Sequence, residues 1–183
     1  MTQKNKENKK KKTQEQIWTE NLASDDKQKV KDTIKEIRDF GNLAILPTLV
    51  DKFAQEQDAE IRKEIEKLLT DIKDKRAAEM LFAYVNDDKY KHIKRDLIGI
   101  LWQSRLDFSP YLEQLIDIFI TDPFDVAFEA FTTIEYFDKA IEPALAEACI
   151  AKLKNNMDKM EQQRKFLMVD LVNMLQKRSE KKS

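Results

Sequence analysis

Residues 45–62 read ILPTLVDKFAQEQDAEIR and contain the pattern that decides the fold. Apolar residues from Leu46 to Phe53 recur at helical spacing, and a second amphipathic segment opens at Ile61, just after Asp58. The proline near the start of the first segment is tolerated there, because the missing N–H would have no partner in the first turn of a helix. An aspartate side chain can accept the unpaired N–H groups of the helix that follows it. The stretch therefore predicts two helices joined by a turn at Asp58.

This pattern recurs along the whole chain at a nearly fixed period. Apolar anchors of the second segments lie 31 to 33 residues apart, at Val30, Ile61, Ile93 and Val126. Anchors of the first segments are spaced by 32, 32, 31 and 33 residues, at Ile17, Leu49, Leu81, Leu112 and Leu145. Two phased anchors in each repeat predict two helices per repeat, and a period of this length is typical of helical solenoids.

The expected helices form five pairs. The first pair is a helix over 13–23 and a second helix that follows the N-cap candidates Ser24 and Asp25 and ends at Phe40, where Gly41 is expected to stop it. The other pairs are expected over about 44–55 and 58–72, 76–85 and 89–104, 109–120 and 123–137, and 142–153 and 158–177. An aspartate at the turn between the two helices is expected to cap the second helix of each pair.

The composition supports an all-α fold. The chain of 183 residues is 42% hydrophobic and 37% charged, with only 2 Gly and 4 Pro, which is the usage of a helical protein with short connections. Residues 1–12 have no apolar side chain after the initiator and are expected to form a disordered Lys-rich tail. Residues 13–177 are expected to form a single solenoid domain, and residues 178–183 a basic C-terminal tail.

The repeats resemble the HEAT-repeat family, an armadillo-type class of helical repeats. The resemblance rests on the proline within Ile45–Val50, on Asp58 at the turn, and on Glu60-Ile61-Arg62 at the start of a second helix. Ile93-Lys94 keeps the apolar-basic step, whereas Val126-Ala127 loses the basic residue. Over roughly residues 13–175, the resemblance implies a right-handed α-α superhelix of about five helix pairs. It also implies a binding scaffold whose second helices line the concave face.

The charge of the chain is unevenly distributed. The formal net charge is −1, but Met1–Lys12 carries +5 and Gln176–Ser183 carries +3, which leaves −9 for Thr13–Leu175. An acidic body argues against a groove for nucleic acid. The basic N-terminal tail could tether the protein to RNA, ribosomes or anionic lipid, or it could simply be a solubilising tail.

Few residues suggest a catalytic or metal-binding role. Cys149 is the single cysteine and cannot form an intramolecular disulfide, and we interpret it as a small buried hydrophobe. His92, the single histidine, has no His or Cys partner at metal-ligand spacing. No catalytic residue, cofactor or metal is therefore expected. No apolar run is long enough for a transmembrane segment or a signal sequence, so a cytoplasmic location is expected.

A candidate partner-binding surface emerges from the second helices. Positions 2, 5, 6 and 9 residues after each anchor should lie opposite the buried stripe. These positions are polar in the first two repeats but apolar or aromatic in the third and fourth. The predicted binding residues are Arg95, Ile98, Trp102, Phe128, Phe131 and Glu135. The alternative is that these aromatic side chains belong to the core or to a homodimer interface.

Two functions follow as hypotheses. The first is a non-enzymatic scaffold or adaptor that binds a protein or peptide on the second-helix face. The alternative is a nucleic-acid-interacting protein, because some HEAT-like arrays resemble alkylpurine DNA glycosylases. That activity would need a tryptophan and a carboxylate in a basic groove, and Trp102 and Glu135 are not assigned to those roles.

Overall fold

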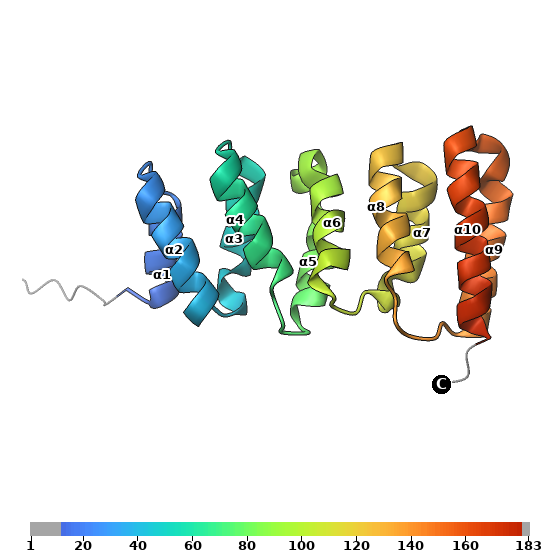
Figure 1. The fold of residues 1–183 in the computed structure, drawn as a ribbon, viewed down its shortest axis with the longest axis horizontal. Coiled ribbons are helices and arrows are strands. Elements are labelled where there is room, and N and C mark those ends of the chain that lie inside the picture. The colour runs from blue at the N-terminus through green and yellow to red at the C-terminus, as the bar shows by residue number, and fades with distance from the viewer. Residues whose placement is uncertain (1–11, 181–183) are drawn as a thin grey trace, which may run out of the picture. The chain divides into compact units, whose positions relative to one another are not determined.

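The computed structural model describes residues 12–180, which form ten α-helices and four 3₁₀ segments and contain no β-strand (Figure 1). The prediction of an all-α protein is confirmed. The chain divides into two compact units, residues 1–69 and residues 70–183, and each is described by itself. We call them the N-terminal and the C-terminal unit. The predicted disordered tail at 1–12 and the end of the basic tail at 178–183 lie largely outside the described residues.

The N-terminal unit consists of two helix pairs. Its elements are α1 (Gln14–Leu22), α2 (Lys27–Phe40), the 3₁₀ segment η1 (Leu43–Ile45), α3 (Leu46–Gln55) and α4 (Ala59–Thr70). Each helix contributes large apolar side chains to the core, among them Trp18, Val30, Ile34, Leu49, Phe53, Ile61 and Ile65. The anchors at Val30, Leu49 and Ile61 are buried as predicted, whereas Ile17 is partly exposed.

Aspartates cap both second helices of this unit. Asp26 accepts hydrogen bonds from the N–H groups of Gln28 and Lys29, so the cap lies one residue beyond the predicted Asp25. Asp58 accepts from the N–H of Ile61 at 3.1 Å and from the ammonium of Lys27 at 2.5 Å. The Lys27 hydrogen bond, together with the backbone donors, lowers the pKa of Asp58 to about 2. Asp58 thus stabilises its own helix and links it to the preceding second helix.

Gly41 ends α2, as predicted, without adopting a left-handed conformation. Its φ of −68° is not left-handed, so the residue is not a left-handed helix cap. Instead, its N–H donates to the carbonyl of Ile37 at 2.7 Å, and a Cβ at position 41 would lie 2.4 Å from that same oxygen. Close approach to the backbone therefore requires glycine here.

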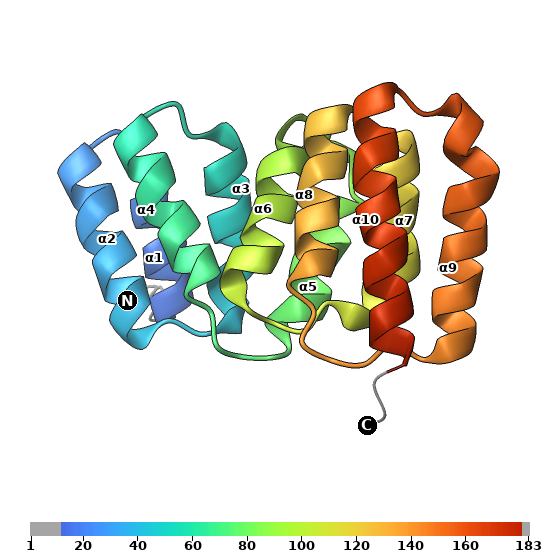
Figure 2. The same cartoon turned by 45° about the vertical axis from the view of Figure 1, so that its right-hand side comes forward.

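The C-terminal unit contains the other three pairs. Its α-helices are α5 (Ala77–Val85), α6 (Lys94–Ser104), α7 (Leu112–Thr121), α8 (Phe124–Glu135), α9 (Pro143–Asn156) and α10 (Gln162–Ser179). Helix α8 packs between α6 and α10, while α7 packs against α9, so that the second helices α6, α8 and α10 form one row (Figure 2). This row carries the candidate site. The predicted single domain over 13–177 stays a prediction.

Several predicted helices begin with a 3₁₀ segment. The expected helix over 89–104 is a 3₁₀ segment η2 (Asp88–Ile93) followed by α6, and η3 (Ser109–Tyr111) and η4 (Met157–Lys159) precede α7 and α10 in the same unit. Such segments are frequent at helix starts, where the first N–H groups lack helical partners. In η2 the ring of Tyr90 is buried and packs edge-on against Tyr84, which fixes the segment to α5.

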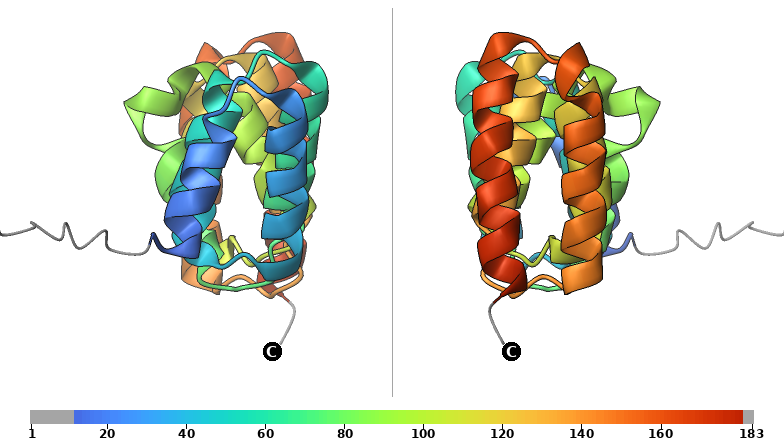
Figure 3. Two further views of the ribbon diagram at one scale, coloured as in Figure 1. Left: turned by 90° about the vertical axis from the view of Figure 1, so that its left-hand side faces the viewer. Right: turned by 90° about the vertical axis from the view of Figure 1, so that its right-hand side faces the viewer.

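Two arginines fix α10 to the preceding pair. Arg164 is buried, and its guanidinium donates to the carbonyls of Phe119 and Ile120 at 2.8 Å and to the carbonyl of Asp122 at 2.7 Å. Arg178 donates to the carbonyls of Ile134 and Glu135 at 2.6 Å. The carboxyl ends of α7 and α8 are thereby satisfied. Figure 3 shows α10 as a straight helix antiparallel to α9, and α10 continues two residues beyond the predicted end at 177.

Candidate functional site

The structure corrects the predicted surface at two residues. Ile98 and Phe131 were expected to face outward, but they are 0% and 8% exposed. Both lie five residues after an anchor, on the flank of the helix that faces the next helix in the row. Packing between α6, α8 and α10 covers this flank.

The remaining predicted residues lie at the surface. Phe128 is 46% exposed, the side chains of Arg95 and Glu135 are exposed, and Trp102 is half-buried. The structure adds Tyr136, which is 57% exposed and directly follows α8. We call Trp102, Phe128 and Tyr136 the aromatic face.

The aromatic face joins α6 to α8. The rings of Trp102 and Tyr136 lie 5.2 Å apart between centroids with an interplanar angle of 31°. The ring of Phe128 lies 6.4 Å from that of the buried Phe131 and nearly parallel to it. Contacts of this kind restrict the aromatic rings without burying them. Side chains held in this way can bind a partner at little cost in conformational entropy.

A carboxylate lies beside the tryptophan, but it is not that of Glu135. The indole Nε1–H of Trp102 donates to Oε2 of Glu129 at 2.9 Å, and the guanidinium of Arg95 lies 3.8 Å from Oε1 of Glu129. Gly99 lies beside this carboxylate, where a Cβ would be 3.5 Å from Oε2 of Glu129, an ordinary contact distance. Glu129 lies three residues after the anchor Val126, a position that the sequence analysis did not consider.

A cavity of about 320 Å³ opens beside Trp102 and Tyr136. Its charged lining residues are Arg105, Asp107, Asp138 and Lys139. Lys139 and Asp107, both in the cavity lining, form an ion pair of 2.5 Å. Burial alone would raise the pKa of Asp107, but the hydrogen bonds from Lys139 and Ser109 outweigh burial and lower this pKa. The cavity therefore has a charged rim beside an aromatic wall.

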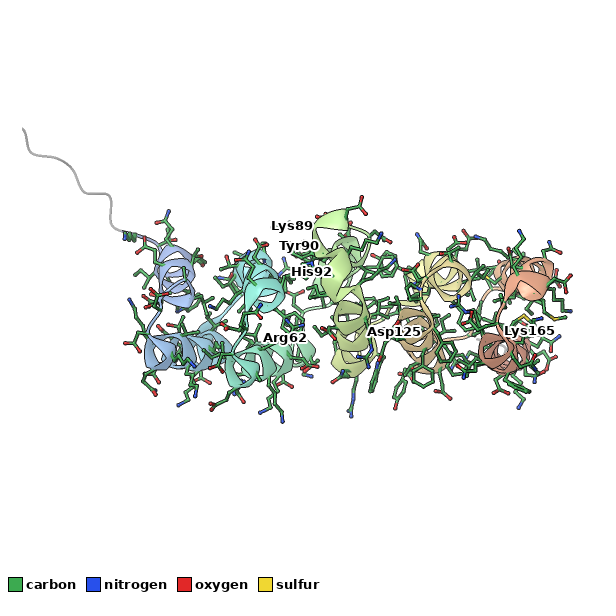
Figure 4. The ribbon with its side chains drawn as sticks, turned by 90° about the horizontal axis from the view of Figure 1, so that it is seen from above. Arg62, Lys89, Tyr90, His92, Asp125 and Lys165 are labelled. Atoms are coloured by element: carbon green, nitrogen blue, oxygen red, sulfur yellow. The ribbon has the colours of Figure 1, made fainter. Side chains whose placement is uncertain are left out.

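The charges on α8 have one sign. Over Phe124–Glu135 the helix carries Asp125, Glu129 and Glu135 and no basic residue. Figure 4 shows Asp125 on α8 and Lys165 on α10, the next helix in the row. A partner that lies over α8 therefore meets aromatic rings bordered by carboxylates.

Other chemically suggestive residues contribute no site. Cys149 is buried in α9, and this burial is the main reason why the pKa of its thiol is raised to about 11. His92 lies in η2 with an exposed side chain. Within residues 12–180, no group of three His, Cys, Asp or Glu side chains is placed to hold a metal ion. In the same range, no helix is both long and apolar enough to cross a membrane.

Comparisons with known proteins add no functional assignment. A scan against models of protein families gives no match, and a search of curated proteins gives no significant match.

Proposed function

We propose that this protein is a non-enzymatic interaction scaffold that binds a peptide segment of another protein over α6 and α8. The aromatic face carries the proposal. Two of its three rings are about half exposed, and large aromatic side chains held at a surface are typical of binding hot spots. The partner segment that fits this surface best is an amphipathic helix, whose apolar side would cover Phe128 and Tyr136.

The helix pairs support a HEAT-like architecture as part of this proposal. Apolar anchors at Val30, Ile61, Ile93 and Val126 are all buried, and each opens or precedes the second helix of a pair. Lys27 pairs with Asp58 in the N-terminal unit, and Lys94 pairs with Asp122 at 2.7 Å in the C-terminal unit. Each of these two ion pairs links a second helix to the turn between the two helices of the following repeat. We propose that about five helix pairs of this kind form a right-handed superhelix. We also propose a cytoplasmic location for the protein.

The nucleic-acid alternative remains a prediction, and no observation favours it. A phosphate backbone over α8 would meet Asp125, Glu129 and Glu135 without a compensating base on that helix. Trp102 does have a carboxylate neighbour, but its surroundings are of mixed charge rather than basic, since the adjacent cavity is lined by Arg105 and Lys139 as well as by Asp107 and Asp138. A homodimer through the same face also remains open, and it is one outcome of the experiment below.

The proposal can be tested with a displayed library of helical peptides selected on the full chain. We expect binders whose dissociation constant rises at least about tenfold for a Phe128→Ala/Tyr136→Ala variant, which corresponds to about 1.4 kcal/mol. Phe40→Ala is the matched control, because Phe40 is an exposed aromatic residue of α2 in the other unit. Thermal melts should show that both variants remain folded.

The proposal would be overturned by binders that bind the double variant as tightly as the unmodified chain. A selection without binders would also overturn it. Sedimentation of the unmodified chain as a dimer and of the double variant as a monomer would instead assign the aromatic face to self-association.

A further inference from the structure

The carboxylate of Glu129 has fewer cationic partners than the equivalent carboxylate of the other unit. Its counterpart in the N-terminal unit is Glu64, which also lies three residues after an anchor. Glu64 accepts from two cations, the guanidinium of Arg38 at 3.2 Å and the ammonium of Lys67 at 2.6 Å. Glu129 accepts one hydrogen bond, from the neutral indole of Trp102, and forms one ion pair, in which the guanidinium of Arg95 lies 3.8 Å from Oε1. The same helical position is thus paired with two cations in one unit and with a single, more distant guanidinium in the other.

Burial makes this difference significant. The side chain of Glu129 is 16% exposed, whereas that of Glu64 is 32% exposed. A carboxylate that is removed from water needs a compensating cation or several hydrogen bonds. Among the described residues, Oε1 of Glu129 accepts no hydrogen bond. The position therefore favours a cation that arrives from outside the chain.

The surroundings of Glu129 suit a flat cation. The indole of Trp102 donates to the carboxylate and is itself flanked by the ring of Tyr136. Cations are attracted to the faces of such rings. Arginine combines a planar group that stacks on aromatic rings with a fork of donors that matches a carboxylate. Lysine offers a compact point charge and cannot stack in this way.

We infer that Glu129, Trp102 and Tyr136 form a receptor for an arginine side chain of the bound peptide. This inference rests on the proposed function and specifies the chemistry of the partner: an amphipathic helix with one arginine beside its apolar stripe. The peptide guanidinium donates to Oε1 of Glu129, which has only the distant Arg95 as a partner, and stacks on the aromatic pair, while the apolar stripe covers Phe128. The acidic residues of α8 favour the same basic partner and repel an acidic one.

The test compares two synthetic helical peptides that share a leucine stripe and differ at one position, arginine in one and citrulline in the other. Citrulline keeps the shape of arginine but carries no charge. We expect the arginine peptide to bind the full chain at least about tenfold more tightly. It should also shift the indole N–H resonance of Trp102, which the Trp18→Phe variant identifies by elimination because the chain has 2 Trp.

Glu129→Gln should abolish the preference for arginine, whereas the matched control Glu64→Gln should retain it. If Glu129→Gln does not fold, Tyr136→Leu provides the second test. This substitution keeps an apolar surface but removes the aromatic ring, so it should reduce the preference for the arginine peptide over the citrulline peptide. Equal binding of the two peptides would overturn the arginine receptor and leave peptide binding by the aromatic face intact. Binding of neither peptide, with no shift of the indole resonance, would overturn both proposals.

Discussion

Arg164 donates a hydrogen bond of 2.8 Å to the backbone carbonyl of Phe119, although 45 residues separate them in the sequence. The same guanidinium also binds the carbonyls of Ile120 and Asp122. A single side chain of α10 therefore satisfies the carboxyl end of α7, which a helix cannot satisfy by itself. The last helix pair is attached by directional hydrogen bonds as well as by apolar packing.

Replacing Arg164 by Met should therefore destabilise the C-terminal unit. The substitution keeps a long apolar side chain but leaves three carbonyls without their donor, so we expect the free energy of unfolding to fall by about 3 kcal/mol. Urea unfolding followed by circular dichroism measures this loss. Lys165→Met is the control, because the neighbouring Lys165 is half-buried in the same helix and makes none of these bonds. Equal stability of the two variants would contradict the role of Arg164.

The two glycines should respond differently to alanine. At Gly41 the added Cβ would lie 2.4 Å from the carbonyl oxygen of Ile37, so the backbone must shift, and we expect a loss of about 2 kcal/mol. At Gly99 the nearest atom would be 3.5 Å away, an ordinary contact, and alanine is the better helix former by about 1 kcal/mol. Thermal melts should thus rank Gly99→Ala at or above the unmodified chain and Gly41→Ala well below it.

Asp58 should contribute to the acid sensitivity of the N-terminal unit. Its pKa is lowered from 3.8 to about 2, chiefly by the hydrogen bond from Lys27, so the folded state favours the charged carboxylate. This stabilisation is complete above the unfolded-state pKa and is lost as the pH falls from about 4 to about 2. Asp58→Asn should therefore melt lower at neutral pH and lose less stability over that interval. Asp25→Asn, at an exposed position between the two helices of the preceding pair, should leave the pH profile unchanged.

The thiol of Cys149 should be unreactive in the folded protein. The pKa of this thiol is raised to about 11, mainly by burial, so almost no thiolate is present at pH 8. A thiol reagent such as 5,5′-dithiobis(2-nitrobenzoic acid) should label the chain slowly in buffer and at once in strong denaturant. Rapid labelling under native conditions would show that α9 opens readily.

Most of the fold could be predicted from the sequence because its signals are local. The anchor leucines Leu49, Leu81 and Leu112 are buried, and Asp26, Asp58 and Asp87 each cap the element that follows. The predicted aspartate cap is wrong for the last two pairs: Asp122 pairs with Lys94 instead, and among the described residues no side chain caps α8 or α10. The 3₁₀ segments were not predicted, since their residues continue the helical pattern and only the tighter hydrogen bonding distinguishes them. The end anchors Ile17 and Leu145 are less buried, because a helix at the end of its row has fewer neighbours.

The candidate site could be predicted only in part. Helical periodicity identified Phe128 and Trp102, but it could not show that a neighbouring helix covers Ile98 and Phe131. Which flank of a helix meets its neighbour depends on the packing of the row rather than on the spacing within one helix. Tyr136 and Glu129 were missed for the same reason, because the exposed and partly exposed positions of α8 and of the residue after it include 125, 128, 129, 132 and 136.

The placement of the two tryptophans supplies the protein with its own optical labels. Trp18 is buried in the N-terminal unit, and Trp102 is half-buried beside a carboxylate in the C-terminal unit. Fluorescence of a Trp102→Phe variant would report on the first unit and that of Trp18→Phe on the second. Whether the halves of this chain melt as one body or in succession can thus be observed without attaching any dye.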